Sequence, residues 1–205
     1  MGRGHWIVYL FLTAPYIHEM LAPAFGLQPK IEGYFLNIHP LKECDFESLY
    51  KVASDPLIWD QHPLPRFERD AFSEFFKAAE ESNSGVVVLD RATGKIVGAS
   101  RYYDLRESQI SVGYTFLARS HWGGIYNREL KTLMLSHAFK YVSMVHFDIG
   151  ETNKRSRKAI EKIGARLIKL QTIQDKPYTL YAIDERMFQA SLQLEGEKNN
   201  GGEPS

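Results

Sequence analysis

Apolar and polar residues along this chain follow two periodicities, which predict strands and helices in a definite order. A strand turns every second side chain to the same face, whereas an amphipathic helix repeats its apolar positions every three or four residues. By these patterns we expect strands at 34–38, 85–89, 95–100, 108–117, 145–149, 166–173 and 177–183. We expect helices at 43–54, at 68–81, from about 127 to 141, and from about 154 to 163.

This order of elements predicts an α+β fold. The segments 85–89 and 95–100 form a hairpin around a glycine turn, and 108–117 follows as a third antiparallel strand. The strand at 145–149 must be reached through a helix, which implies a right-handed crossover and a parallel neighbour. We therefore expect a mixed, mostly antiparallel central sheet that is flanked by helices on both faces.

Length and composition favour one domain with two appended segments. The chain has 205 residues, of which 44% are apolar, and no break in composition demands a second core. We place an N-terminal extension at 1–30, the domain at 31–194 and a disordered tail at 195–205, where Gly, Asn, Glu and Lys dominate. The apolar run near the N-terminus is too short and interrupted for a membrane span, and we expect it to pack on or near the domain. A signal peptide is the alternative, since Arg3 precedes the run and 22–24 resembles a cleavage site.

Charge and cysteine content exclude several classes of function. Lys plus Arg and Asp plus Glu are equal at 25 each, so no bulk positive field exists to hold nucleic acid or an anionic membrane. Any anionic ligand must be held locally. The single cysteine, Cys44, excludes an intrachain disulfide and a multi-cysteine zinc site. We expect no metal and a cytoplasmic location.

The segment 119–127 is the first candidate for such a local anion site. It contains Gly123 and Gly124 and joins the strand at 108–117 to the longest predicted helix. The unpaired N–H groups of a helix's first turn, together with the helix dipole, bind phosphate groups. The alternative is that the two glycines only make a tight turn.

Four sequence motifs give the chain a resemblance to a known family. They are Gly98 in the strand after the hairpin, Val112-Gly-Tyr-Thr-Phe-Leu117, Trp122-Gly-Gly-Ile-Tyr-Asn127, and Asn153-Lys-Arg-Ser156 followed by Lys162-Ile-Gly-Ala165. Together with the order of elements, they resemble the GNAT superfamily of acyl-CoA-dependent N-acyltransferases over about residues 34–184. The last motif is similar to the branch that includes the ribosomal-protein N-terminal acetyltransferases.

The resemblance implies acetyl-CoA as cosubstrate and suggests where it lies. In the family, the strand that corresponds to 108–117 splays from the one that corresponds to 145–149, and the pantetheine occupies the gap. Asn153 would then hydrogen-bond the pantetheine; the alternative is a cap on the following helix, which is a good use of Asn at that position and can coexist with the first role. The residues expected to contact the cofactor are Phe116, Leu117, Ala118, Trp122, Gly123, Gly124, Ile125, Tyr126, Asn127, Asn153 and Ser156.

Two features depart from the family's pattern. Trp122, Ile125 and Asn127 stand where the family usually has Gln or Arg, Gly, and Gly or Ala. In addition, Ser111 replaces a glutamate that is common in the related branch. Because a β-branched residue resists positive φ, we expect Ile125 to be helical, with its side chain turned outward or onto the core while Gly123 and Gly124 form the turn.

The chemistry implied by the resemblance is direct transfer. A neutral amine attacks the thioester and the departing thiolate takes a proton, for which Ser156 is the candidate and Tyr126 or Tyr114 are alternatives. First-turn capping is the competing role for Ser156. The candidates for the general base, directly or through water, are Glu129, Asp148, Glu151 and His62.

The acceptor is expected on the side of the loop at 57–67, which carries several large side chains. We place Trp59, Gln61, His62 and Arg101 there. The sequence thus predicts an N-acetyltransferase that moves an acetyl group to a primary amine, on a small molecule or a protein N-terminus. The alternative is a catalytically silent acyl-CoA-binding protein of the same fold, and a homodimer stays open alongside a monomer.

Overall fold

The computed structural model describes residues 25–200, with side chains described as far as Leu194, and its centre is one eight-stranded sheet. The order of strands across the sheet is β1-β2-β3-β4-β5-β6-β8-β7, and every neighbouring pair is antiparallel except β5 with β6. This confirms the expected mixed, mostly antiparallel sheet. The strands are β1 Ile31–Glu32, β2 Leu36–Pro40, β3 Gly85–Asp90, β4 Ile96–Arg106, β5 Gln109–Leu117, β6 Met144–Gly150, β7 Arg166–Ile173 and β8 Lys176–Asp184.

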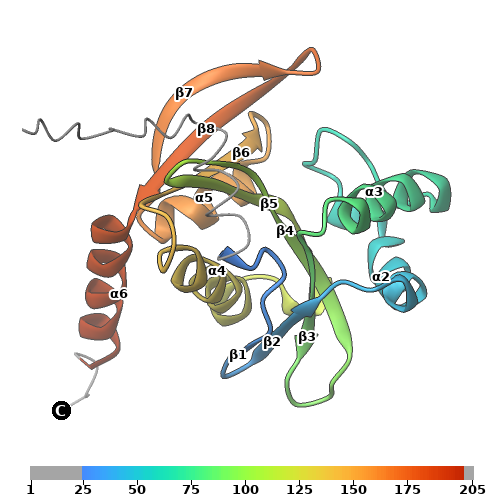
Figure 1. Ribbon diagram of the computed structural model, residues 1–205, viewed down its shortest axis with the longest axis horizontal. Helices are drawn as coiled ribbons and strands as arrows, with labels where there is room; N and C mark the ends of the chain where they lie inside the picture. Colours follow the sequence, from blue (N-terminus) through green and yellow to red (C-terminus); the bar gives the residue numbers. More distant parts are fainter. Residues whose placement is uncertain (1–24, 201–205) are drawn as a thin grey trace, which may run out of the picture.

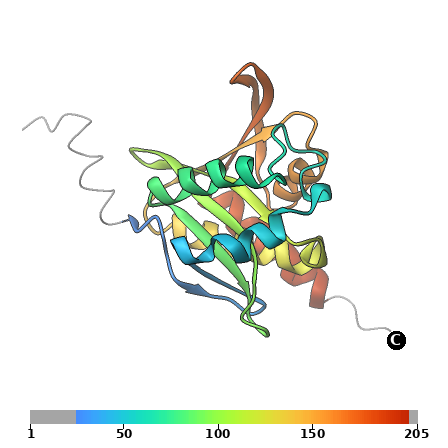
Figure 2. The ribbon, with the colours of Figure 1, turned by 90° about the vertical axis from the view of Figure 1, so that its right-hand side faces the viewer.

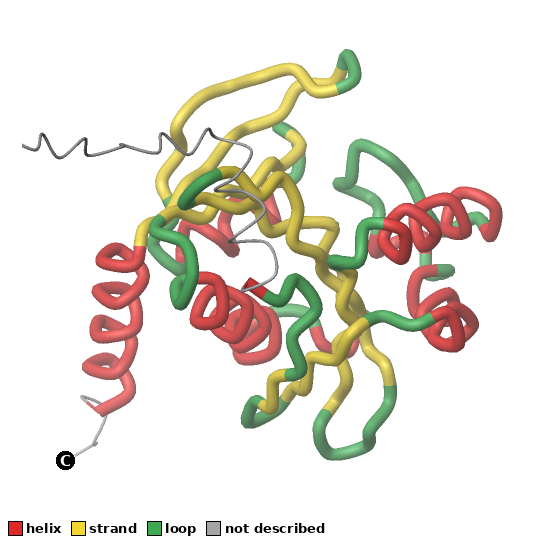
Figure 3. Tube along the Cα trace, in the orientation of Figure 1, coloured by secondary structure: helices red, strands yellow, loops and turns green. Residues whose placement is uncertain are grey.

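Helices cover both faces of the sheet (Figure 1). One face carries α2 (Phe46–Ala53) and α3 (Arg69–Glu81), which lie in front of the strands when the molecule is turned (Figure 2). The other carries α4 (Gly124–Ala138), α5 (Lys154–Lys162) and α6 (Glu185–Asn200), and Figure 3 shows how the loops connect the two layers. Short 3-10 turns precede three of these helices, namely η1 Glu43–Asp45, η2 Pro56–Ile58 and η3 Arg119–His121.

Each face of the sheet packs its own apolar core. Side chains of α2 and α3 pack against β3, β4 and β5 on one side, whereas those of α4, α5 and α6 pack against the sheet on the other. Tyr102 is fully buried on the α4 side, and its hydroxyl donates to the carbonyl of Met134 at 2.6 Å. Phe25 is 1% exposed and packs edge-on against Tyr102. Phe25, in the described end of the N-terminal extension, therefore packs on the domain.

Several element boundaries differ from the predictions. The main helix begins at Gly124 rather than near 127, and β4 continues to Arg106 through the segment expected to be a loop. We expected no helix after the last strand, but α6 runs from Glu185 to Asn200 and so includes residues 195–200, for which we expected disorder. Phe188 explains why this helix docks, because its ring packs on Phe139 at the end of α4. Residues 1–24 and 201–205, which include the N-terminal apolar run and its cleavage-like site, lie outside the described residues.

No described helix is both long enough and apolar enough to cross a membrane.

The strands β5 and β6 separate soon after they pair. Their parallel ladder joins Gln109 to Met144, Ile110 to Val145 and Ser111 to His146, and it goes no further. On its other side, β5 has a bulge against β4, where Tyr114 has φ of 53° although it is not glycine. A bulge bends its strand and increases the local twist. The expected gap between the strands is thus present, and it opens beyond Ser111.

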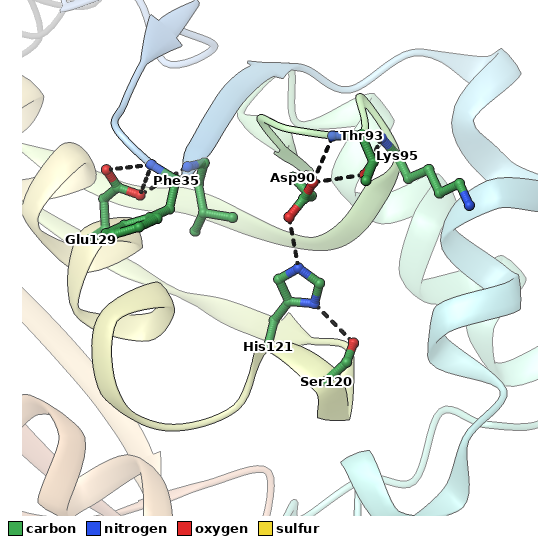
Figure 4. A network of polar contacts seen from close by, with 8 residues as sticks. Phe35, Asp90, Thr93, Lys95, Ser120, His121 and Glu129 are labelled. Atoms are coloured by element: carbon green, nitrogen blue, oxygen red, sulfur yellow. Dashed lines mark hydrogen bonds and ion pairs between the residues drawn. The ribbon is translucent and has the colours of Figure 1, made fainter.

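Glu129 anchors α4 to the start of β2 (Figure 4). Its carboxylate accepts hydrogen bonds from the backbone N–H groups of Tyr34, Phe35 and Leu36, with Oε2 at 2.9 Å from Phe35 N and 2.8 Å from Leu36 N. Both oxygens are therefore used in holding the chain. The arrangement does not support Glu129 as a general base, because its carboxylate serves the fold rather than a reacting amine.

We predict that Glu129→Gln destabilises the protein by about 1–3 kcal/mol. A glutamine keeps one acceptor oxygen but places an NH₂ group where N–H donors already converge, so part of the backbone of β2 loses its partner. Urea denaturation followed by circular dichroism measures the change. The control is Glu47→Gln, which removes an exposed carboxylate paired with Arg69 and should leave the free energy of unfolding nearly unchanged. Equal stability of the two variants would show that the Glu129 carboxylate anchors nothing.

Candidate active site

A cavity of about 400 Å³ occupies the gap between β5 and β6. Its lining includes the splayed halves of both strands, the first turn of α4 and the first turns of α5. Eight of the eleven residues expected to contact the cofactor line it: Phe116, Leu117, Trp122, Gly123, Gly124, Asn127, Asn153 and Ser156. Ala118, Ile125 and Tyr126 do not line it. The ring of Tyr126 instead packs against Phe35 and His121, so the structure gives no support to Tyr126 as a catalytic residue.

The N-terminus of α4 opens into this cavity without a side-chain cap. Gly123 and Gly124 have φ of 74° and 47°, a region that side chains disfavour, and no side chain of the described residues caps the first turn of the helix. Ile125 is helical and 47% exposed, which confirms the conformation expected for it. The uncapped N–H groups and the helix dipole therefore form a site suited to phosphate oxygens.

Asn153 both caps α5 and lines the cavity. Its Oδ1 accepts the N–H of Ser156 at 3.0 Å, so the capping role is confirmed. The side chain is nearly buried, and its Nδ2 makes no hydrogen bond to any described residue. Capping uses the oxygen alone, which leaves the NH₂ group able to donate to a ligand in the cavity.

Lys131 is a buried cation in the cavity that our sequence analysis did not identify. It lies on α4, is 6% exposed, and donates from Nζ to Thr115 Oγ1 at 2.9 Å. Removal from water lowers the pKa of Lys131 from its usual 10.5 to about 8. Lys131 is three residues before Met134 and seven before Ala138, so helical spacing places it on the buried apolar face of α4. A lysine on that face was the signal in the sequence that could have identified it.

A second cavity, of about 540 Å³, adjoins the first. The two share His62, Tyr114, Asp148 and Tyr178, and the second is also lined by Arg66, Arg101 and side chains of α3. Among the residues expected near the acceptor, Trp59 lines the first cavity, Arg101 lines the second and His62 lines both. Gln61 lines neither, because its Oε1 accepts the N–H of Arg155 at 3.1 Å at the start of α5.

The remaining candidates for a base differ in where they lie. Burial, followed by the charge of Arg66, lowers the pKa of His62 to about 4, so its imidazole is a weak base at neutral pH. Glu151 lines neither cavity. Asp148 is the one carboxylate among the described residues that lines both cavities, and its Oδ2 accepts the hydroxyl of Tyr103 at 2.8 Å. The structure thus brings one carboxylate to the junction of the two spaces.

Comparison with known proteins gives a clear family match. The model of the acetyltransferase (GNAT) domain matches residues 36–166, which is more than half of the chain. No curated protein matches the chain significantly in sequence.

Solved structures of acetyltransferases share this fold at low sequence identity. A GCN5-related N-acetyltransferase from Brucella melitensis is 18% identical, with a TM-score of 0.69 over 81% of this chain and 85% of that one. A GNAT-family acetyltransferase from Bacillus anthracis is 19% identical, with a TM-score of 0.66 over 77% and 99%. Mycobacterium smegmatis RimJ, solved with CoA-disulfide, is 14% identical, with a TM-score of 0.63 over 78% and 89%.

We predict that Lys131 makes the stability rise with pH above about pH 8. Its pKa is about 8 when folded and about 10.4 in an unfolded chain, so between these values the unfolded state binds more protons and folding gains up to about 3 kcal/mol. Lys131→Met should abolish this rise. Urea denaturation of both proteins at several values from pH 7 to pH 10 tests it, and parallel curves for the two proteins would contradict it.

Proposed function

This chain belongs to the GNAT family of acetyltransferases, and we propose that it moves the acetyl group of acetyl-CoA to a primary amine by direct attack. The observation that carries the proposal is the gap between β5 and β6, which is lined by polar groups and ends at an uncapped helix N-terminus. A long, thin cosubstrate with phosphates at one end and a thioester at the other fits such a space.

The residues of the first cavity suit acetyl-CoA along its length. The phosphates would lie at the first turn of α4, where Gly123 and Gly124 allow close approach and the cations of Arg128, Lys158 and Lys162 line the same cavity. The pantetheine arm would run along the unpaired part of β5, within reach of the Asn153 amide. The thioester would then lie near the bulge at Tyr114, beside the second cavity.

The reaction requires two proton transfers, and the cavity holds groups for both. The neutral amine attacks the carbonyl carbon, a C–N bond forms, the C–S bond breaks, and the amine proton passes to Asp148 or to water. The thiolate takes a proton from Ser156, whose hydroxyl makes no hydrogen bond to the described residues, or from Lys131. The pKa of Lys131, about 8, is close to the value of about 8.5 for a free thiol, so this transfer is nearly balanced.

A catalytically silent acyl-CoA-binding protein is the second candidate. It is favoured by the contacts of Asp148, whose two carboxylate oxygens already accept hydrogen bonds from Tyr103 and Gln171. Ile125 gives no support to this second candidate, because its side chain is exposed and does not line the cavity.

Two measurements test the proposal and separate these candidates. Calorimetry should show binding of acetyl-CoA, and mass spectrometry should show an acetylated product when a panel of amines is added. Binding without any product would support the silent protein, and no heat at all would refute both. Asn153→Asp provides a control, because aspartate also caps a helix but cannot donate to the pantetheine. This variant should keep its melting temperature and bind acetyl-CoA about tenfold more weakly.

We further predict that Ser156→Ala lowers kcat more than it weakens acetyl-CoA binding, by about 10- to 100-fold in kcat. Help to a departing thiolate is needed mainly in the transition state, so the loss should not extend to the ground-state complex. Steady-state kinetics combined with calorimetry measures the two effects. Lys131→Met is the matched variant, and the larger loss of kcat identifies the group that protonates the sulfur. Equal loss of kcat and affinity in Ser156→Ala would indicate a structural role.

A further inference from the structure

The second cavity holds two arginines that have no acidic partner in the part of the chain that the structure describes. Arg66 is 9% exposed and Arg101 is 8% exposed, and both line the cavity. Within the described residues, neither forms an ion pair. Charged groups are almost never buried unless they are paired, because removal from water is costly. Two unpaired cations in one cavity therefore call for a chemical explanation.

Arg101 lies on β4 and is held from one side only. Its Nη1 donates to the carbonyl of Ala78 at 2.9 Å, and its guanidinium stacks on the ring of Tyr114 with Cζ 3.7 Å from the ring centroid. Its Nε is buried and has no hydrogen-bond partner among residues 25–194. Nε and Nη2 form the side-on fork of a guanidinium, so the edge that binds a carboxylate through two parallel hydrogen bonds is the edge left unused.

Arg66 lies in the loop before α3, and its guanidinium also contacts neutral groups. Its Nη1 lies 3.2 Å from His62 Nδ1, and its Cζ lies 4.6 Å from the ring centroid of Phe75. His62 is a neutral partner and offers no compensating charge. Burial lowers the pKa of Arg66 to about 10, and the nearby charge of Arg101 lowers it as well. The two guanidinium groups thus repel each other within one low-dielectric space.

Other titratable groups in this cavity do not balance the two charges. Glu74 is exposed on α3 and bonds neither arginine, and Asp148 accepts hydrogen bonds from Tyr103 and Gln171 at the junction with the first cavity. Tyr103, Tyr114 and Tyr178 complete the set of titratable groups that face the cavity, and burial raises the pKa of Tyr103 and Tyr178. The charges of the two arginines are therefore not balanced by any described carboxylate that bonds them.

We infer that the amine acceptor of this protein carries a carboxylate, which Arg101 and Arg66 bind in the second cavity while its amino group points to the first. This inference rests on the proposed acetyltransferase function and names the class of its acceptor. An acidic oxygen pair satisfies the unused guanidinium edges and removes the repulsion between them. The shared carboxylate Asp148 lies where the amino group would pass between the cavities, so the acceptor resembles a free amino acid or a related small amine.

The transfer remains balanced with such an acceptor. The ammonium first loses a proton to water, and the neutral nitrogen attacks the thioester carbonyl. As the C–S bond breaks, the nitrogen loses its second proton to Asp148 or water and the thiolate takes a proton from Ser156 or Lys131, which gives an amide and a free thiol. The carboxylate takes no part in bond making. Its role is to place the nitrogen, and a buried polar site of this kind rejects analogues that lack the matching group because its own donors are then left unpaired.

The test compares amine acceptors that carry a carboxylate, a neutral amide, or a different anionic group. The wild-type protein is assayed for thiol release and acetylated product with amino acids, the corresponding amino acid amides, and amines that carry a phosphate or a sulfonate. We expect kcat/KM for the best amino acid to exceed that for its amide by at least about 100-fold. Equal use of the amide would overturn the inference, and a preference for phosphate or sulfonate would overturn the assignment of carboxylate.

Variants of Arg101 test whether the preference for a carboxylate depends on this arginine. Arg101→Leu should lower kcat/KM for the amino acid about 100-fold, mainly through KM, and should lower the value for the amide far less. Arg101→Lys keeps the charge but lacks the fork, and it should lose about tenfold. Arg106→Leu is the matched control, because Arg106 lies on the same strand, is exposed and pairs with Asp104. Equal loss with amino acid and amide in Arg101→Leu would indicate a structural role and overturn the inference.

A binding experiment tests the carboxylate site independently of acetyl transfer. Should no amine be acetylated, thermal shift in the presence of coenzyme A and N-acetyl amino acids still reports on the site. Stabilisation of the wild type that is lost in Arg101→Leu would support a carboxylate site in a silent protein. No stabilisation by any carboxylate ligand would overturn it.

Discussion

The separation of β5 from β6 is the constraint on which the rest of this molecule depends. A sheet gains stability from a continuous ladder, yet here the ladder stops after three residue pairs. The backbone groups beyond Ser111 and His146 on the facing edges are thus left for another partner. The loop before α3 fills one end of the opening, because Pro63 lies so close to Gly150 that a Cβ there would be 2.5 Å from Pro63 Cγ. Lys176 holds this loop in place through a 2.7 Å hydrogen bond to the carbonyl of Pro63.

The distribution of charge follows from the same opening. The chain as a whole has no net charge, so a bulk field cannot attract an anion. Cations instead lie buried where the two cavities form, with Lys131 in the first and Arg66 and Arg101 in the second. Burial of an unpaired charge costs free energy, and proteins tolerate such a cost at functional sites. Local placement of charge therefore takes the role that net charge has in many anion-binding proteins.

Local patterns in the sequence predicted most of the fold, whereas contacts between distant residues were not predictable from it. Alternation and helical spacing identified the strands and helices, and the helical conformation of Ile125 and the cap made by Asn153 followed from short-range rules. Glu129 could not be assigned, because its backbone partners lie 93–95 residues earlier in the chain. Arg66 drew no attention for a similar reason, since its isolation from carboxylates appears only once the loop, α3 and β5 come together. The helix α6 was missed because its contact with Phe139 is also long-range.

Tyr114 connects the two cavities through different parts of one residue. Its backbone, with φ of 53°, forms the bulge that turns β5 away from β6 and so shapes the cosubstrate gap. Its ring lies against Arg101, with Tyr103 edge-on at a centroid distance of 5.1 Å, and so forms part of the second cavity. A non-glycine residue in this region of φ is strained, and such strain persists only where the surroundings hold it. Backbone pairing of Gly113 and Phe116 with β4, on either side of the bulge, supplies that restraint. One residue thus contributes its ring to the site that would bind the acceptor's carboxylate and its backbone to the gap that would receive the thioester.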